Sequence, residues 1–374
     1  MYAFSNNQNN AAHLNKNDHG LRQSSLLIHY KGVGVKYGLL SHWWGPGKHS
    51  ALAISSNAPS QKSLSLGTFK DIQLNKLSIG FKVLAIPFKN YMQQQIYFSG
   101  LKANISYNSS NSTTTIGFHR TYLSGDFFRS DFDSGVSRKW TIFDAASLVF
   151  EPLFGQSKKG LEYALPGTPG FDVWDQLLSG FILLKFHEEN LEIYLDLASD
   201  DNRANFIDLR AHWDHTLGYQ LGINKVFKYK RYEILTGAEF LTTRISNTLN
   251  PKFNRGDPNS PNFYTKKVYD YFSYKGRRMG AHSGSSSDDL IFLFGLKNKE
   301  SAIMISYNKE RHGIKSMSYP ELKSEYSISY QRNFFKNHKL YLNAEYEKID
   351  NYAFIENNVS VSNLFLIGYS LYFN

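Results

Sequence analysis

Hydrophobic and polar residues alternate along most of this chain, from about residue 25 to its last residue. In the segment LEIYLDL, residues 191–197, every odd position is Leu or Ile, and the positions between them carry Glu192, Tyr194 and Asp196. The same period of two recurs in other segments, including 216–225, 325–331 and 340–347. Successive side chains of a β-strand point to opposite faces, so this pattern predicts strands with one apolar and one polar face.

The connections between these strands are of two kinds that take turns along the chain. Short polar connections are expected at 108–112, 187–190, 228–230, 298–300 and 336–338. Long connections are expected at 41–62, 123–173, 200–215, 246–287, 309–320 and 351–358. This alternation is typical of an outer-membrane β-barrel, which has tight periplasmic turns and long extracellular loops.

The last segment supports the same interpretation. Aromatic and aliphatic residues occupy every second position from Phe365 to Phe373, as in the terminal assembly strand of bacterial outer-membrane proteins. If the C-terminus is periplasmic, counting backwards gives about fourteen antiparallel strands. We therefore predict an all-β protein with one transmembrane barrel over residues 25–374. Residues 1–24 form a separate polar segment, either disordered or part of a truncated start.

Composition narrows the class of protein further. The mean hydropathy is −0.41 and no run of eighteen apolar residues occurs, so no transmembrane helix is predicted, although membrane strands would escape that criterion. The chain has no Cys, which excludes disulfides and thiolate metal sites. Its start lacks a basic stretch followed by an apolar one, so no secretory signal is recognised.

The formal net charge is +10, which favours an anionic partner. The basic residues are scattered in pairs along the chain instead of being concentrated on one element, as they are in most nucleic-acid-binding proteins. We therefore expect no nucleic acid as partner. Lipid phosphate or an acidic polysaccharide fits the charge better.

Paired tryptophans, Trp43 and Trp44, run directly into a turn formed by Gly45, Pro46 and Gly47. The strand count places this turn, and all five tryptophans, at or near the extracellular end. The two rings either brace the barrel mouth or stack on a sugar, and we favour bracing. The glycines are expected to permit the turn.

Polysaccharide recognition needs flat aromatic faces for sugar rings and planar polar groups for hydroxyls, while Arg contacts carboxylates in a bidentate manner. The expected extracellular loops supply such groups, and the candidate binding residues are Trp43, Trp44, Asn57, Trp213, Arg277, Arg278, His282, Asp288 and Arg311. An equal alternative is that Arg277 pairs with Asp288 or Asp289 and pins its own loop. No metal site is predicted, because no second histidine lies at metal-ligand spacing from His282.

Four stretches resemble a known family. SHWWGPGKHSALAISSNAPSQKSLSL, from residue 41, resembles the tryptophan-Gly-Pro-Gly signature of the capsule assembly protein Wzi family. IGFHR at 116–120, NFIDLR at 205–210 and YKGRRMGAHSGSSSDDL at 274–290 resemble further stretches of that family. The resemblance implies an outer-membrane barrel, larger than the one counted here, that binds capsular or other surface polysaccharide. It also implies a lectin-like protein without catalysis, and strands and a signal peptide preceding Met1.

The sequence thus predicts a non-enzymatic surface protein of a Gram-negative outer membrane that attaches polysaccharide to the cell, with acidic polysaccharide among the candidates. We expect contact with outer-membrane lipid or lipopolysaccharide, a monomer, and no cofactor. A porin for sugars or small anionic solutes is the main alternative. An outer-membrane hydrolase is a third, but no nucleophile motif supports it, and carboxylates such as Glu192 and Asp196 suit a polar barrel interior.

Overall fold

The computed structural model describes residues 2–5, 23–89, 93, 95–125, 127–128, 137–138, 175–200, 217–244, 263–264, 272–314, 316–335 and 338–371. The predicted binding residue Trp213, the stretch 205–210 and most of the expected connection 123–173 lie outside these residues.

The described chain is almost entirely β-structure. Its first strands are β1 (Tyr2–Ser5), β2 (Ser24–Tyr30), β3 (Val33–Leu40), β4 (Gln61–Thr68), β5 (Ile72–Leu74), β6 (Leu77–Lys89), β7 (Gln95–Asn108) and β8 (Ser112–Gly125). The middle strands are β9 (Phe127–Phe128), β10 (Ser137–Arg138), β11 (Asp175–Phe186), β12 (Leu191–Asp200), β13 (Leu217–Tyr229), β14 (Tyr232–Thr242), β15 (Ser273–Tyr274) and β16 (Arg277–Arg278). The last elements are β17 (Asp288–Lys297), β18 (Ser301–His312), β19 (Glu321–Phe335), β20 (His338–Asp350), the 3-10 helix η5 (Tyr352–Phe354) and β21 (Val359–Leu371).

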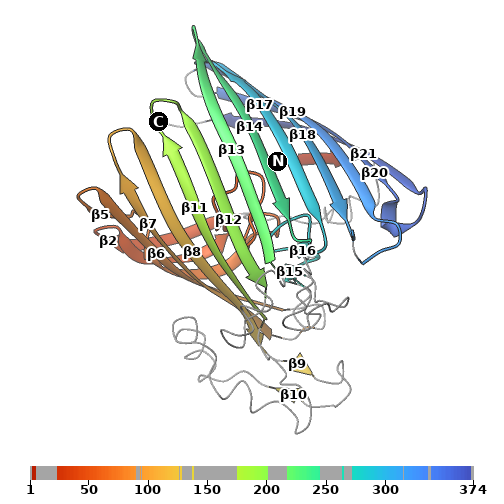
Figure 1. Cartoon of the computed structure of the whole chain (residues 1–374), viewed down its shortest axis with the longest axis horizontal. Coiled ribbons are helices and arrows are strands. Elements are labelled where there is room, and N and C mark those ends of the chain that lie inside the picture. Colours follow the sequence, from red (N-terminus) through yellow and green to blue (C-terminus); the bar gives the residue numbers. More distant parts are fainter. Residues whose placement is uncertain are drawn as a thin grey trace, which may run out of the picture.

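Seventeen of these strands form one antiparallel sheet that curves around a hollow (Figure 1). Neighbouring strands pair in the order β2, β3, β4, β6, β7, β8, β11, β12, β13, β14, β17, β18, β19, β20, β21 and β1, with β5 also paired to β6. The predicted barrel architecture is confirmed, with more strands than the fourteen counted from sequence. The short strands Tyr2–Ser5 and Ile72–Leu74 hold too few residues to show a period of two.

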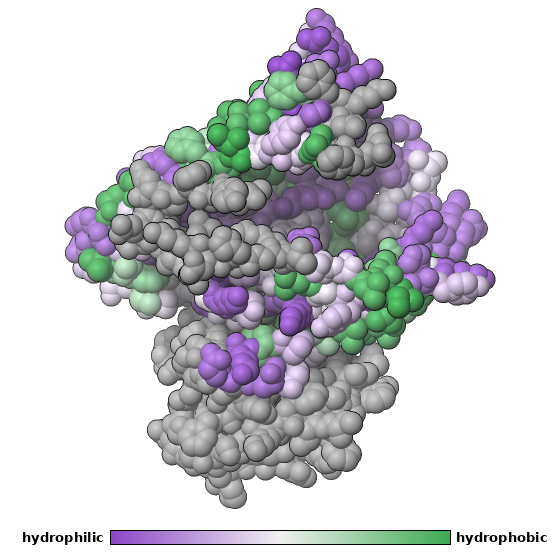
Figure 2. Space-filling model, turned by 180° about the vertical axis from the view of Figure 1, so that it is seen from behind, coloured by the Kyte–Doolittle hydropathy of each residue, from purple (hydrophilic) through white to green (hydrophobic). Residues whose placement is uncertain are grey.

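The two faces of the sheet carry the side chains that the alternation predicted. On β12, Leu195 and Leu197 are exposed on the outside, whereas Tyr194 and Asp196 are buried on the inside. On β21, Phe365 is 62% exposed and Ile367 is 70% exposed. Figure 2 shows the hollow, with hydrophilic residues gathered inside it. A whole wall of large, exposed apolar side chains is unfavourable in water. The outer face is therefore suited to lipid.

Short and long connections lie at opposite ends of the sheet. The short-turn end holds connections such as 31–32, 109–111, 187–190, 230–231 and 298–300. The other end holds the long connections, including 41–60 and 243–287, and the hairpin β15–β16 lies near it in Figure 1, opposite the β13–β14 turn. Within the described part of the chain, no helix is long and apolar enough to cross a membrane.

The interior is also divided between these ends. Toward the short turns, the inner faces of β14 and β17–β21 line a cavity of about 1160 Å³. Toward the long connections, the space is filled by residues 41–60, which pack a cluster of buried apolar side chains against the wall. That cluster includes Trp44, Leu52, Ile54, Leu84, Phe98, Phe263, Tyr264, Phe272 and Met279.

Candidate functional site

The segment 41–60, here called the inward loop, does not extend away from the barrel but folds across its inner face. Its ends join β3 to β4, and its middle contacts strands on the far side of the hollow, including β12, β14 and β17. Trp44 donates its backbone N–H to the carbonyl of Ile54 at 2.8 Å, which closes the loop on itself. The sequence predicts an extracellular loop here, but apolar residues such as Leu52 and Ile54 gain more by burial inside the barrel.

Glu239 of β14 anchors the middle of the inward loop. Its carboxylate accepts backbone N–H groups from Lys48 at 2.7 Å, His49 at 3.2 Å and Ser50 at 2.9 Å. The hydroxyl of Tyr194 donates to the same carboxylate. Glu239 is 3% exposed, so these donors replace the water that a buried charge would otherwise lose. Sequence patterns gave no sign of this anchor, because its partners lie about 190 residues away.

The two tryptophans of the loop have different surroundings. Trp44 is 3% exposed, and its ring lies against the backbone of Gly100, where an added Cβ would sit 2.6 Å from the ring. It also faces the ring of His119, with centroids 5.9 Å apart. Trp43 is only half-buried and donates its indole N–H to the carbonyl of Gly47 at 2.9 Å. The buried ring of Trp44 offers no free face to a sugar, which fits the bracing role.

The turn after the tryptophans passes close to the wall. Gly45 has φ +149, a conformation that side chains disfavour. A Cβ on Gly47 would lie 2.1 Å from the side-chain nitrogen of Gln220, whose amide donates to the carbonyl of Ser50. Pro46 between them is buried. The three residues therefore let the backbone turn while it touches β13.

A second segment covers the inward loop. The hairpin β15–β16 carries Lys275 and Arg277, both exposed, and the partly buried Arg278; we call residues 273–278 the basic hairpin. Asn57 donates its side-chain amide to the carbonyl of Arg278 at 3.1 Å, and Ser55 donates its hydroxyl to the carbonyl of Gly280 at 2.6 Å. Asn57 thus joins two parts of the protein, and the arginines of the hairpin stay at the surface.

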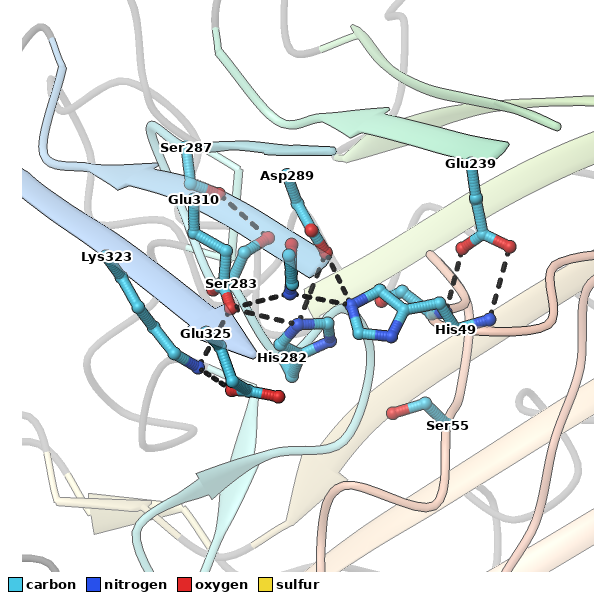
Figure 3. A network of polar contacts seen from close by, with 12 residues as sticks. His49, Ser55, Glu239, His282, Ser283, Ser287, Asp289, Glu310, Lys323 and Glu325 are labelled. Atoms are coloured by element: carbon cyan, nitrogen blue, oxygen red, sulfur yellow. Dashed lines mark hydrogen bonds and ion pairs between the residues drawn. The ribbon is translucent and has the colours of Figure 1, made fainter. Parts of the chain in front are cut away.

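Beside these contacts, two histidines and a carboxylate meet. Both His49 and His282 direct Nε2 at the same oxygen of Asp289, at 3.4 and 3.2 Å (Figure 3). His49 comes from the inward loop, His282 from the connection between β16 and β17, and Asp289 from β17. Asp289 is 1% exposed, while each histidine side chain is about one-fifth exposed.

Glu310 on β18 links this meeting point to a further charged network. Lys323 of β19 lies 2.9 Å from Glu310 and also contacts Glu325 and Glu347 at 2.9 and 3.2 Å. His312 lies 2.8 Å from the other oxygen of Glu310. One buried lysine is therefore surrounded by three carboxylates, and the network makes this part of the inner wall rich in negative charge.

Two histidines in the long connections have pKa values that are shifted in opposite directions. Burial disfavours the protonated ring of His282, but Glu310 and Asp289 outweigh it, so the pKa is raised above its usual value. Burial, reinforced by Lys82 and Lys36, lowers the pKa of His42 to about 4. His42 is thus neutral at physiological pH, and its Nε2 lies 2.9 Å from the hydroxyl of Ser63.

Two predicted loop residues belong to the barrel wall. Asp288 is the first residue of β17, Arg311 lies near the end of β18, and the two residues are paired in register and joined by an ion pair. Asp288 also accepts a hydrogen bond from Thr242 at 2.6 Å. Asp288 therefore pairs with Arg311 and not with Arg277, because the strand register places Arg311 directly opposite Asp288.

Only part of this site was predicted from the sequence. His282 was a candidate, and it lies at the centre of the polar network. His49, Glu239, Asp289 and Glu310 were not candidates. The only signal for His49 was its position in the signature stretch from residue 41, four residues after Gly45.

Comparisons with known proteins agree with this architecture. The sequence model of the capsule assembly protein Wzi family matches residues 1–82. A solved structure of Wzi from Escherichia coli, described as an outer-membrane, carbohydrate-binding β-barrel involved in group 1 capsule assembly, superposes with a TM-score of 0.62 at 12% identity. The match covers 92% of this chain and 69% of that one.

Other solved structures are more distant. The outer-membrane channel DcaP of Acinetobacter baumannii gives a TM-score of 0.36 at 8% identity, covering 84% of this chain and 86% of that one. BamA of Haemophilus ducreyi gives 0.40 at 9% identity, covering 90% and 64%. No curated protein sequence matches this chain.

The family match over the first 82 residues includes the whole signature stretch, and the fold match extends over nearly the whole chain. The resemblance found in the sequence is therefore confirmed. Over residues 1–82 the chain is similar to the capsule assembly protein Wzi family, and its fold is that of an outer-membrane β-barrel.

Proposed function

We propose that this protein binds an acidic surface polysaccharide at its long-connection end and holds it at the cell surface, without catalysis. The observation that carries the proposal is the basic hairpin. Lys275 and Arg277 are exposed beside the partly buried Arg278, on a support fixed to the inward loop by Asn57 and Ser55. A fixed group of cations loses little conformational freedom when it binds the carboxylates of a sugar polymer.

Five of the remaining predicted residues fall into two groups under this proposal. Trp44, Asn57 and Asp288 support the binding surface from within the barrel. Trp43, half-buried, and Arg311, whose side chain is 47% exposed, lie where a polymer could touch them. The E. coli Wzi barrel is described as carbohydrate-binding, which favours the same class of ligand here.

The test replaces Lys275 and Arg277 together by Gln and measures how much acidic polysaccharide the folded barrel binds in detergent and retains on cells. We expect binding to fall at least about tenfold, the effect of losing about 1.4 kcal/mol of interaction. The matched control replaces Lys230 and Arg231 by Gln. These residues form the β13–β14 turn at the opposite end, where Lys230 lies over Tyr229 much as Lys275 lies over Tyr274.

Equal losses in both double variants would mean that the polymer responds only to net charge, and the hairpin would not be the site. Unchanged binding in the Lys275/Arg277 variant would also reject it. The porin alternative predicts a steady open conductance of the wild-type barrel in planar bilayers. The inward loop supports a low conductance instead, because it occupies the half of the interior nearest the long connections.

A further inference from the structure

Where His49, His282 and Asp289 meet, there are more hydrogen-bond acceptors than the neighbouring donors can satisfy. Neither carboxylate oxygen of Asp289 accepts a hydrogen bond of normal geometry among the described residues, although the side chain is almost fully buried. Two imidazole Nε2 atoms, those of His49 and His282, lie 3.4 and 3.2 Å from its Oδ2. A buried carboxylate without donors is costly unless a positive charge lies beside it.

The side chain of Asn308 also leaves hydrogen-bond acceptors facing each other without a donor between them. Its amide nitrogen lies 3.0 Å from Nε2 of His49 and 3.0 Å from Oε1 of Glu310. If it donates to His49, that Nε2 carries a lone pair that also faces Asp289. If the amide is turned over, its oxygen faces Glu310 instead. Either orientation leaves two acceptors in contact, which a cation between the side chains would relieve.

The geometry is that of metal ligands. The three ligand atoms lie within 4.8 Å of one another, and the two Nε2–Oδ2 separations are 3.2 and 3.4 Å. Ligand atoms that sit about 2.0–2.1 Å from a tetrahedral zinc ion are about 3.3 Å apart. The two imidazole rings are almost perpendicular, at 84°, so both can present Nε2 to one point without clashing.

We propose that His49, His282 and Asp289 bind a divalent transition-metal ion of the zinc class, which ties the inward loop to the barrel wall. Two imidazole nitrogens and one carboxylate favour such an ion over Ca²⁺ or Mg²⁺, which prefer oxygen ligands. Three protein ligands leave at least one coordination position for water or another oxygen. The partial exposure of both histidines gives the ion a route in.

Because the ligands come from three separate elements, the ion would also stabilise the folded barrel. The backbone of His49 is already fixed by Glu239 at 3.2 Å, and Asp289 is fixed in β17 by its pairing with Glu310. Binding to the folded state alone raises stability by mass action. Zn²⁺ should therefore raise the unfolding temperature of the wild-type barrel, and Mg²⁺ should not.

The experiment uses the full chain, refolded in detergent without a polyhistidine tag and stripped with a chelator. Calorimetry with Zn²⁺, Ca²⁺ and Mg²⁺ is carried out on the wild type and on His49→Gln, His282→Gln and Asp289→Asn. We expect one Zn²⁺ per wild-type chain and at least about 100-fold weaker binding in each variant, more than the loss of an outer-shell partner causes. His42→Gln, in the same loop, is the matched control and should bind Zn²⁺ within about threefold of the wild type, too small a change for a lost ligand.

A second measurement does not depend on the variants folding. Zinc X-ray absorption of the wild-type protein should show two imidazole ligands, with nitrogen and oxygen at about 2.0–2.2 Å. The proposal is overturned if the wild type takes up no Zn²⁺ in a saturable manner, if His42→Gln weakens binding as much as His49→Gln does, or if the spectrum contains no imidazole. The contacts would then be those of a protonated His282 between carboxylates.

Discussion

The half of the barrel near the long connections and the half near the short turns have walls of the same construction but different interiors. In the first half, the inward loop and the network around Glu310 fill the space with buried and paired side chains. In the second, residues such as Leu235, Ser329 and Asn343 line a cavity of about 1160 Å³. The strands alternate in the same way through both halves, so the wall pattern alone does not decide what lies inside.

This difference predicts where substitutions should change the stability of the protein. In the filled half, an inner side chain has partners from distant parts of the chain, so its loss is felt in the free energy of unfolding. In the open half, an inner side chain faces a cavity, and most changes there should be tolerated. Substitutions in the two halves, and a change of pH, test this contrast.

The largest effect is expected for Trp44→Ala. The ring is 3% exposed and packs on Gly100, so its removal leaves a cavity and should cost about 3–5 kcal/mol of unfolding free energy. Trp43→Ala is the control and should cost about 1–2 kcal/mol, since it loses partial packing and one hydrogen bond. Urea unfolding of the barrel in lipid vesicles measures both. Similar losses for the two would contradict the bracing role of Trp44.

The next effect is expected for Glu239→Gln, a change of nearly equal volume. It removes the charge that accepts three backbone N–H groups of the inward loop, and it should cost about 2–3 kcal/mol. Glu233→Gln, on the same strand near the short turns, removes only an exposed pair with Lys297 and should cost less than about 1 kcal/mol.

Planar-bilayer recordings add a second readout for this pair. A released inward loop should raise the conductance of the Glu239→Gln barrel above that of the Glu233→Gln barrel. If both variants conduct and unfold like the wild type, the loop is held by its apolar residues alone.

The smallest effect concerns pH. The pKa of His42 is about 4 in the folded protein and near 6.5 when the ring is free, so the unfolded chain binds more protons in between. Stability contributed by neutral His42 is therefore complete above pH 6.5 and is lost as the pH falls toward 4. We expect the free energy of unfolding to fall by about 1–2 kcal/mol over this pH range. The effect is limited because water still reaches the ring.

His42→Gln should flatten this part of the pH profile. A profile that is unchanged by His42→Gln would assign the acid sensitivity to other groups.

Much of the fold could be predicted because the barrel wall follows a local rule. Residues two apart share a face, so Leu195 and Leu197 on one side and Tyr194 and Asp196 on the other reveal the strand without any partner. The site could be predicted only in part. His282 was recognised as a candidate, but Asp288 and Arg311 were expected in loops, since strand ends are difficult to place where polar residues continue the alternation.

The strands, their apolar outer face, the sorting of short and long connections to opposite ends, and the family resemblance of the stretch from residue 41 can be inferred from the sequence. Each of these depends on neighbouring residues or on a local motif. Three features become visible only in the folded chain: this stretch turns inward, Glu239 fixes it, and His49 lies beside His282, 233 positions further along the chain. Such contacts depend on the curvature of the sheet, which brings together side chains that no spacing within the sequence connects.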